Sequence, residues 1–337
     1  MAHTPTFELG ELPSFSIIVE TENLSSSELE GLSASLNSIA AQDIPPTAAN
    51  EVLILESGDV PAEMIQRLCQ DYPWLTVRSI PANLDYYAAK MKGVALATGE
   101  VIVLADSDCV YEPNWLRSLL QPFADATVQA IAGETRTSSK GTYGLAISLT
   151  YIFPPFSQKN TLQPTRFYFC NNAAFRRLFL LKHPIPTDLP IYRGNCVIHA
   201  HTLTQQGITL WRQPAARATH AAPNGISHFL WRFLLLGYDT LLIYRLKRSP
   251  GNTEPVVKPV LDLGISLAIA LFRVKQVIQR LVILILEHPL RLLNLPVALV
   301  VALASLLLFT VGLIISYVRP TCFLSPTGRV EVDWENS

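Results

Sequence analysis

An apolar run that ends on two acids is the feature that most limits how this chain can fold. Residues 101–105 read Val-Ile-Val-Leu-Ala, and Asp106, Ser107 and Asp108 follow directly. Such a run predicts a buried strand of a sheet covered by helices, and α/β proteins bind ligands at the carboxyl ends of such strands. Two acids this close repel each other unless a cation neutralises them. The pattern therefore indicates a site for Mg²⁺ or Mn²⁺ that carries a phosphorylated ligand, with an ordinary strand-to-turn junction as the alternative.

Strands and helices alternate through the first hundred residues. The predicted elements are, in chain order, a strand at 15–19, a helix that follows 25–27, a strand at 52–55, a helix at 61–71, a strand at 76–80, a helix at 86–97 and the strand at 101–105. This alternation calls for βαβ units, and hence for an α/β fold with a doubly wound, mostly parallel sheet. The sequence has no Gly-x-Gly-x-x-Gly motif and no Gly-Lys-Ser/Thr motif, which disfavours dinucleotide and P-loop chemistry.

Composition divides the chain into two parts. The chain is 49% hydrophobic and only 16% charged, with a mean hydropathy of +0.28, and the excess of Leu, Ile, Val and Ala lies beyond residue 225. The net charge of -1, without a basic stripe, argues against a nucleic-acid partner. Five scattered cysteines predict a reducing compartment, and the N-terminus carries no signal-peptide pattern.

The C-terminal part predicts contact with a membrane. Residues 295–318 contain no charged residue and predict a transmembrane helix. Residues 261–286 are also apolar, but charges such as Arg273 and Arg280 favour an amphipathic helix in the interface, with a second span as the alternative. Residues 228–247 also predict an interfacial helix. Lys and Arg residues gather on the N-terminal side of the confident span, so the positive-inside rule places the globular part in the cytoplasm.

Five segments in the same order resemble the family 2 glycosyltransferases of the GT-A fold. They are residues 16–23, 51–59, 89–108 with 113–116, 171–177, and 218–220. The resemblance implies a nucleoside-diphosphate-sugar donor, a divalent metal (Mn²⁺ or Mg²⁺) on the Asp-x-Asp motif, and transfer of a sugar to an acceptor hydroxyl. The Gln-x-x-Arg-Trp pattern of processive synthases is absent, which favours transfer of a single sugar. The membrane segments suggest a lipid or a glycan as the acceptor.

This reading gives the chain a predicted organisation. The regions are an N-terminal tail at 1–13, a GT-A catalytic domain at 14–225, interfacial helices at 226–291, a transmembrane helix at 292–319 and a C-terminal tail at 320–337.

The same resemblance implies roles for individual residues. The predicted metal ligands are Asp106, Asp108 and His220. The predicted donor-binding residues are Thr21, Glu22, Glu56 and Asp106. The predicted acceptor-side residues are Asn171, Asn172 and Arg193. Each has an ordinary alternative as a turn, capping or surface residue, which also holds for Arg136 and Arg166.

One departure from the family pattern concerns the catalytic base. The acidic pair that supplies this base falls on Asn195 and Cys196, which have no carboxylate. The replacement candidates are Asp188, upstream in the chain, and His199 or His201 on the following helix. Arg193 is a candidate to hold an anionic acceptor or the diphosphate. The absence of the acid also supports an alternative function, in which a catalytically degenerate domain binds a nucleotide sugar or a partner and transfers nothing.

Overall fold

The computed structural model of the chain describes residues 12–21, 29–58, 60–82, 84–248 and 255–324. The chain divides into two compact units. The first, called the sheet unit here, comprises Met1–Thr135, Phe156–Thr187 and His199–His220. The second, the helical unit, comprises Arg136–Pro155, Asp188–Ile198 and Ala221–Ser337. Two segments that the sequence placed in the catalytic domain therefore belong with the C-terminal helices.

A nine-stranded sheet forms the centre of the sheet unit. Its strands are β1 (Phe15–Glu20), β2 (Glu51–Glu56), β3 (Leu75–Ser79), β4 (Val101–Asp106), β5 (Cys109–Tyr111), β6 (Ala130–Thr137), β7 (Gln163–Thr165), β8 (Asn172–Arg176) and β9 (Leu210–His220). The helices between them are α1 (Leu29–Ala40), η1 (Pro46–Ala48), α2 (Ala62–Asp71), α3 (Tyr86–Leu96), α4 (Trp115–Leu120), η2 (Gln121–Ala124), α6 (Arg177–Lys182) and α7 (Asn195–Gln205).

The order of the strands is β3-β2-β1-β4-β8-β6-β9-β5, and β7 pairs with β9. The first four strands are parallel, as their alternation with helices predicted. β8 then pairs antiparallel with β4, and both β5 and β7 pair antiparallel with β9. The α/β fold class is thus confirmed, with the parallel strands confined to the N-terminal half of a mixed sheet.

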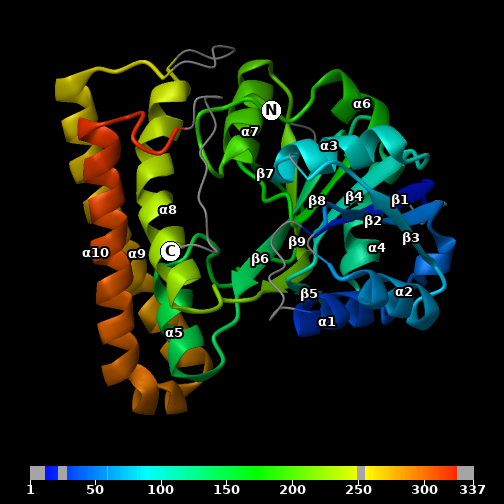
Figure 1. Ribbon diagram of the computed structural model, residues 1–337, viewed down its shortest axis with the longest axis horizontal. Coiled ribbons are helices and arrows are strands. Elements are labelled where there is room, and N and C mark those ends of the chain that lie inside the picture. Colours follow the sequence, from blue (N-terminus) through cyan, green and yellow to red (C-terminus); the bar gives the residue numbers. More distant parts are fainter. Residues whose placement is uncertain (1–11, 22–28, 59, 83, 249–254, 325–337) are drawn as a thin grey trace. The chain divides into compact units, whose positions relative to one another are not determined.

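Helices cover both faces of the sheet (Figure 1). Ile17 and Val19 of β1 belong to one buried cluster with Leu32 and Leu36 of α1. Strand side chains alternate between the two faces, so Ile18 points to the opposite face, towards α3. This double cover explains why β1 to β4 read as continuous apolar runs.

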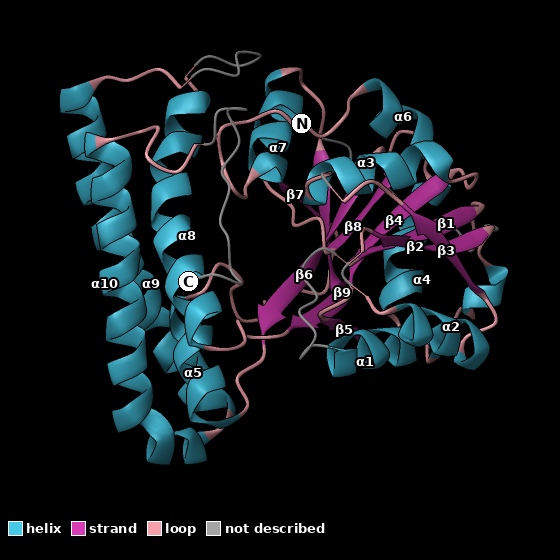
Figure 2. Ribbon diagram, viewed as in Figure 1, coloured by secondary structure: helices cyan, strands magenta, loops and turns pink. Residues whose placement is uncertain are grey.

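The helical unit contains α5 (Gly141–Thr150), α8 (Ile226–Leu246), α9 (Pro259–Glu287), η3 (Pro289–Asn294) and α10 (Leu295–Val318), and its long helices are apparent in Figure 2. α10 coincides with the predicted span. By length and composition, the helices at Ile226–Leu246 and Pro289–Val318 are the two in the described chain that are long and apolar enough to cross a membrane. The first of these was predicted to lie in the interface.

Two charged residues of α9, Arg280 and Asp262, are buried against protein, whereas Lys275 is exposed. The Arg280 side chain is 5% exposed, and its guanidinium donates to the backbone carbonyls of Ser148 and Tyr151 at the C-terminal end of α5. Carbonyls at a helix end lack intrahelical partners and attract cations. Asp262, at the other end of α9, is fully buried and pairs with Arg245 Nε (2.8 Å) and Arg248 Nη1 (2.6 Å). These charges are satisfied inside the bundle, so they do not by themselves oppose burial of α9 in a membrane; whether α9 spans or lies in the interface stays a prediction.

Candidate active site

The first acid of the Asp-Ser-Asp turn lies in a buried polar network beneath the sheet edge. The Asp106 carboxylate is 2.6 Å from Lys90 Nζ, and both of its oxygens accept from the Tyr86 hydroxyl at 2.9 Å. Lys90 is fully buried and also donates to the carbonyl of Ala105 (2.7 Å). Burial lowers the pKa of Lys90, but the charges of Asp106 and Glu20 and the hydrogen bond to Asp106 together outweigh it and leave that pKa raised. Lys90 is therefore charged at neutral pH, which suits its contact with the Asp106 carboxylate.

The backbone of this turn is fixed from two further sides. The Ser35 hydroxyl of α1 donates to the Asp106 carbonyl (3.0 Å), and the Asp106 N–H donates to the Tyr111 hydroxyl (2.8 Å). That hydroxyl also donates to the carbonyl of Asn171 (3.1 Å). The turn after β4 therefore has a defined geometry, which presents the next acid at the edge of the sheet.

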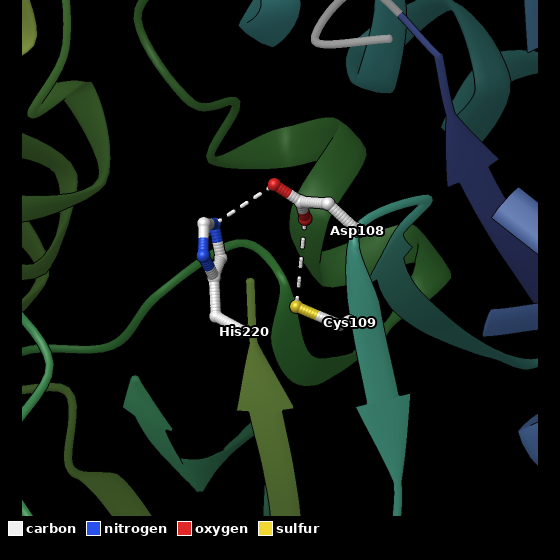
Figure 3. A group of neighbouring side chains, drawn as sticks. All are labelled: Asp108, Cys109 and His220. Carbon is white, nitrogen blue, oxygen red and sulfur yellow. Dashed lines mark hydrogen bonds and ion pairs between the residues drawn. The ribbon is translucent and has the colours of Figure 1, made fainter. Parts of the chain in front are cut away.

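The Asp108 carboxylate points towards His220 at the end of β9 (Figure 3). Its Oδ2 lies 3.1 Å from His220 Nε2, and its Oδ1 lies 3.7 Å from the Cys109 Sγ. The register of β5 and β9 accounts for this meeting, because Cys109 pairs directly with His220 across the ladder. Burial raises the pKa of Asp108, but the charge of His220 and the hydrogen bonds from His220 and Cys109 outweigh it and leave that pKa lowered.

Asp108, Cys109 and His220 are the group that fits a metal ion among the residues that the structure describes. One ligand atom from each, an oxygen, a sulfur and a nitrogen, lies within 4.8 Å of the others. The side chains of His220 and Asp108 are 14% and 15% exposed, so solvent reaches the group. Two of the three predicted metal ligands are thus brought together. Asp106 is not part of this group, because its oxygens contact Tyr86 and Lys90; its roles towards metal and donor stay predictions.

Two of the predicted donor-binding residues, Thr21 and Glu56, form hydrogen bonds with the backbone of the sheet unit. Thr21 is fully buried, and its hydroxyl donates to the Leu55 carbonyl (2.9 Å). The Glu56 carboxylate accepts from the backbone N–H groups of Gly58 and Val60 in the turn after β2. Glu22 lies outside the described residues. Donor contacts of Thr21 and Glu56 stay predictions.

Asn172 is a structural residue at the centre of the sheet unit. Its Oδ1 accepts from Trp115 Nε1 (2.8 Å). Its Nδ2 donates to the carbonyls of Glu134 and Ala216 (3.0 Å each), and the side chain is fully buried. These bonds account for both amide hydrogens and one oxygen lone pair, so the structure does not support the predicted contact with an acceptor.

Asn171 is also buried, at 3% exposed, and its Oδ1 accepts from the Thr135 hydroxyl (3.0 Å). The two neighbouring asparagines therefore hold strands together in this structure. The acceptor-side role of Asn171 stays a prediction.

His199, a candidate base, has both ring nitrogens engaged inside the protein. Nε2 lies 2.9 Å from the carbonyl of His183 and Nδ1 lies 2.7 Å from the Tyr168 hydroxyl. A carbonyl can only accept, so Nε2 carries the hydrogen and the tyrosine donates to Nδ1. His199 is 3% exposed, and burial lowers its pKa to about 4. This geometry leaves no ring nitrogen for an acceptor hydroxyl, and we do not retain His199 as the base.

Two other candidates, Asp188 and Arg193, lie in the helical unit. Asp188 is exposed in a loop. The Arg193 guanidinium lies over the Tyr192 ring, 4.3 Å from its centroid, while the Arg193 N–H donates to Asp239 Oδ2 (2.9 Å). Asn195, where the family has an acid, is 2% exposed at the start of α7. The roles predicted for Asp188 and Arg193 stay predictions.

Three residues with clear positions in this site were missed from the sequence. Lys90 and Tyr86 lie one turn apart on α3, and the sequence does not distinguish the buried Lys90 from the exposed Lys92 of the same helix. Cys109 directly follows Asp108, but its closeness to His220 depends on the β5–β9 register, which the sequence does not specify.

The fold and this edge of the sheet define a GT-A domain, and comparison with known proteins agrees. Residues 16–183 match the family described as glycosyl transferase family 2. The chain therefore belongs to that family.

Relatives with curated descriptions are similar over part of their length. An uncharacterized glycosyltransferase of Nostoc sp. is 27% identical over 210 residues, which cover 58% of this chain and 63% of that protein. Glycosyltransferase AglE of Haloferax volcanii is 25% identical over 124 residues, which cover 36% of this chain and 39% of that protein. The chain thus matches less than two thirds of either relative.

Two solved structures share the fold. A mannosyltransferase from Pyrobaculum calidifontis, in complex with GDP-Man and Mn²⁺, superposes with a TM-score of 0.60 at 17% identity, covering 94% of this chain and 90% of that one. GalNAc-T7 with UDP, GalNAc and Mn²⁺ superposes with a TM-score of 0.51 at 15% identity, covering 63% of this chain and 44% of that one.

Proposed function

We propose that this protein is a membrane-anchored, metal-dependent glycosyltransferase. It moves a single hexosyl group from a nucleoside-diphosphate sugar to a hydroxyl of a lipid or a lipid-linked glycan. The observation that carries the proposal is the Asp108–His220 pair, 3.1 Å apart at the edge of the sheet in a member of family 2. The Mn²⁺ and nucleotide or nucleotide sugar bound by the two proteins of similar fold support the same donor class.

The residues of the turn would divide the work of binding the donor. Asp108 and His220 would hold a divalent ion, which neutralises the negative charge on a departing nucleoside diphosphate. Lys90 and Asp106 would keep the turn, and hence Asp108, at a fixed position through their buried pair. A fixed position for Asp108 would favour catalysis, because groups held in the correct geometry before the reaction lower its entropic cost.

A nucleotide-sugar-binding module without transferase activity is the second candidate function. It rests on the absence of a carboxylate at Asn195 and Cys196, and on the internal bonds that occupy His199. Asp188 and His201 are then the remaining candidate bases among the residues predicted for that role. A protein that binds the donor tightly and never releases the nucleotide would match this alternative.

The helical unit would provide the membrane anchor. Many leucines, isoleucines and valines of α9, η3 and α10 are exposed, among them Leu271, Leu286, Leu293, Leu303 and Leu307. Apolar surface on this scale is typical of contact with lipid. With the anchor in the membrane, the positive-inside rule would place the sheet unit on the cytoplasmic side.

Release of nucleoside diphosphate tests the function. Purified protein in detergent would receive Mn²⁺, a panel of nucleotide sugars and a lipid extract, and we expect nucleotide release with one donor. Asp108→Asn should reduce that rate by at least about a hundredfold, because electrostatic groups at the reacting centre contribute on that order. Asp71→Asn is the matched control, since Asp71 is an exposed acid of α2 that pairs with Arg67. Equal rates for parent and Asp108→Asn would rule out the proposed metal site, and donor binding without release would establish the binding module.

A further inference from the structure

A thiol lies beside the two residues that the proposed metal site uses. Mg²⁺ and Mn²⁺ prefer oxygen ligands, whereas sulfur favours softer ions such as Zn²⁺ and Co²⁺. Building on the proposed function, we propose that Cys109 is the third protein ligand of this site, and that the site prefers Zn²⁺ and Co²⁺ to Mg²⁺.

The three side chains lie close enough for one ion to bind all of them, because their ligand atoms are within 4.8 Å of one another. With zinc bonds of ordinary length, neighbouring oxygen and nitrogen ligands lie about 3.3 Å apart, and oxygen and sulfur ligands about 3.5 Å apart. The structure gives 3.1 Å from Asp108 Oδ2 to His220 Nε2 and 3.7 Å from Asp108 Oδ1 to Cys109 Sγ. These two distances start from different oxygens of Asp108, so a rotation of its carboxyl group would bring one oxygen, the nitrogen and the sulfur around a single ion.

The three side chains differ in exposure in the way that an open metal site requires. Cys109 is fully buried, whereas His220 and Asp108 are 14% and 15% exposed. The sulfur would thus close the inner side of the site, and the fourth position would face outwards. Catalytic zinc sites have three protein ligands and one open position of this kind, which here would accept water or a phosphate oxygen.

Coordination changes the charge of the thiol. As the metal bonds form, the Cys109 S–H proton and the hydrogen on His220 Nε2 pass to the buffer, and the hydrogen bonds from both groups to Asp108 are replaced by metal bonds. The thiolate and the Asp108 carboxylate then balance the two charges of the ion, and His220 binds through a neutral ring nitrogen. No oxidant or other reactant is needed.

The competing explanation is that Cys109 only fills space. Its side chain belongs to the buried cluster of the sheet unit, together with Ala216 and Ala218 of β9. A packing role and a ligand role differ in one observable property. Only a ligand changes the electronic spectrum of a bound ion.

Cobalt binding tests the proposal directly. The full chain in detergent, carrying Cys69→Ser and Cys322→Ser to remove the exposed thiols, would be titrated with Co²⁺. We expect an intense near-ultraviolet band from thiolate-to-cobalt charge transfer. Cys109→Ala should abolish this band and weaken Zn²⁺ binding at least tenfold, since changes even outside the ligand set cost about 10- to 100-fold. Mn²⁺ binding, which depends less on sulfur, should weaken less than Zn²⁺ binding.

The controls separate this inference from the proposed function. Cys170→Ala removes another buried thiol of the same unit and should leave the band in place. Thermal unfolding checks that Cys109→Ala is folded, with Cys109→Ser as the second variant. A parent protein that binds Co²⁺ without the band, or an equal ratio of Zn²⁺ to Mn²⁺ affinity in parent and variant, would overturn the thiol ligand. In that case, sugar transfer with Mn²⁺ would still establish the proposed function. A cobalt band without sugar transfer would establish the thiol ligand and contradict the proposed function.

Discussion

Asp106 and Asp108 are one residue apart in the chain but occupy different surroundings. Asp106 is 5% exposed and pairs with the buried Lys90, whereas Asp108 faces His220 at the sheet edge. One acid therefore fixes the turn and the other is available to a ligand. A two-acid motif in a sequence does not show this division, because it depends on the residue that α3 places beneath the strand.

Lys90 is expected to contribute strongly to stability. In Lys90→Met the Asp106 carboxylate stays buried without its counter-charge, and loss of one partner of a buried pair costs about 3–5 kcal/mol. Urea unfolding would measure this change. Lys92→Met, at an exposed position of the same helix, is the control and should change little. If Lys90→Met and Lys92→Met unfolded at the same urea concentration, the pair would have no structural role.

His199 predicts how stability depends on pH. Burial lowers its pKa to about 4 in the folded protein, whereas an exposed histidine titrates near 6.5. Between these values the unfolded chain binds the additional proton, so stability falls as the pH falls from about 6.5 to about 4, by about 3 kcal/mol in all. His199→Gln should flatten this part of the curve, and His288→Gln, at an exposed position, should not. Thermal unfolding measured over this pH range tests the prediction. Parallel curves of stability against pH for the parent and His199→Gln would contradict the role of His199.

Part of the site was predictable residue by residue. The Asp-x-Asp motif and the final histidine came from an ordered resemblance, and the structure brings Asp108 and His220 together. Asn172 could not be judged in advance, since an asparagine that binds a sugar and one that joins Trp115 to two strands have the same side chain. Long-range pairing decides between them.

At the scale of elements, the strands and helices predicted by apolar spacing in the first hundred residues were confirmed. α5 was missed, because its apolar residues continue around the helix and it carries no polar face. It is buried against the C-terminal helices, where Leu145 and Leu149 pack with Leu284 and Ala302. Burial on all sides removes the periodic signal on which sequence reasoning depends.

Two glycines determine how closely α8 and α10 approach. A Cβ at Gly237 would lie 1.9 Å from the Phe309 carbonyl oxygen, and one at Gly312 would lie 1.9 Å from that of Leu234. Backbone cannot move aside as a flexible side chain can, so Gly237→Ala should destabilise the protein by about 1–3 kcal/mol.

The control for this prediction lies on the neighbouring helix. A Cβ at Gly264 of α9 meets nothing within 4 Å, so Gly264→Ala should stabilise the helix by about 1 kcal/mol. Thermal unfolding in detergent compares the two variants. A Gly237→Ala protein as stable as Gly264→Ala would show that α8 and α10 do not pack through their glycines.

For the whole molecule, the segregation of apolar residues beyond residue 225 indicated a separate C-terminal part, and the structure has a helical unit there. Its membership differs from the prediction, because 136–155 and 188–198 join it from within the preceding sequence. These segments join the helical unit through tertiary contacts, for example the hydrogen bond from Arg280 to the carbonyl of Tyr151 after α5. A local sequence pattern does not reveal contacts of this kind.

The anchor can be tested by flotation with liposomes. Leu303 and Leu307 of α10 are 65% and 66% exposed, and lysines there would carry charge into the hydrocarbon region. We expect the parent protein to float with the vesicles and the Leu303→Lys, Leu307→Lys variant to remain below. Leu178→Lys, at a 75% exposed position of α6 in the sheet unit, should still float. Flotation of the double lysine variant would contradict an α10 anchor.

The fully buried Asp262 of α9, held by Arg245 and Arg248 from the end of α8, also concerns how these two helices are held together. In either helix alone these charged groups would lack their partners, whereas together one carboxylate binds two guanidinium groups. We therefore expect the two helices to remain associated after cleavage of the peptide between them.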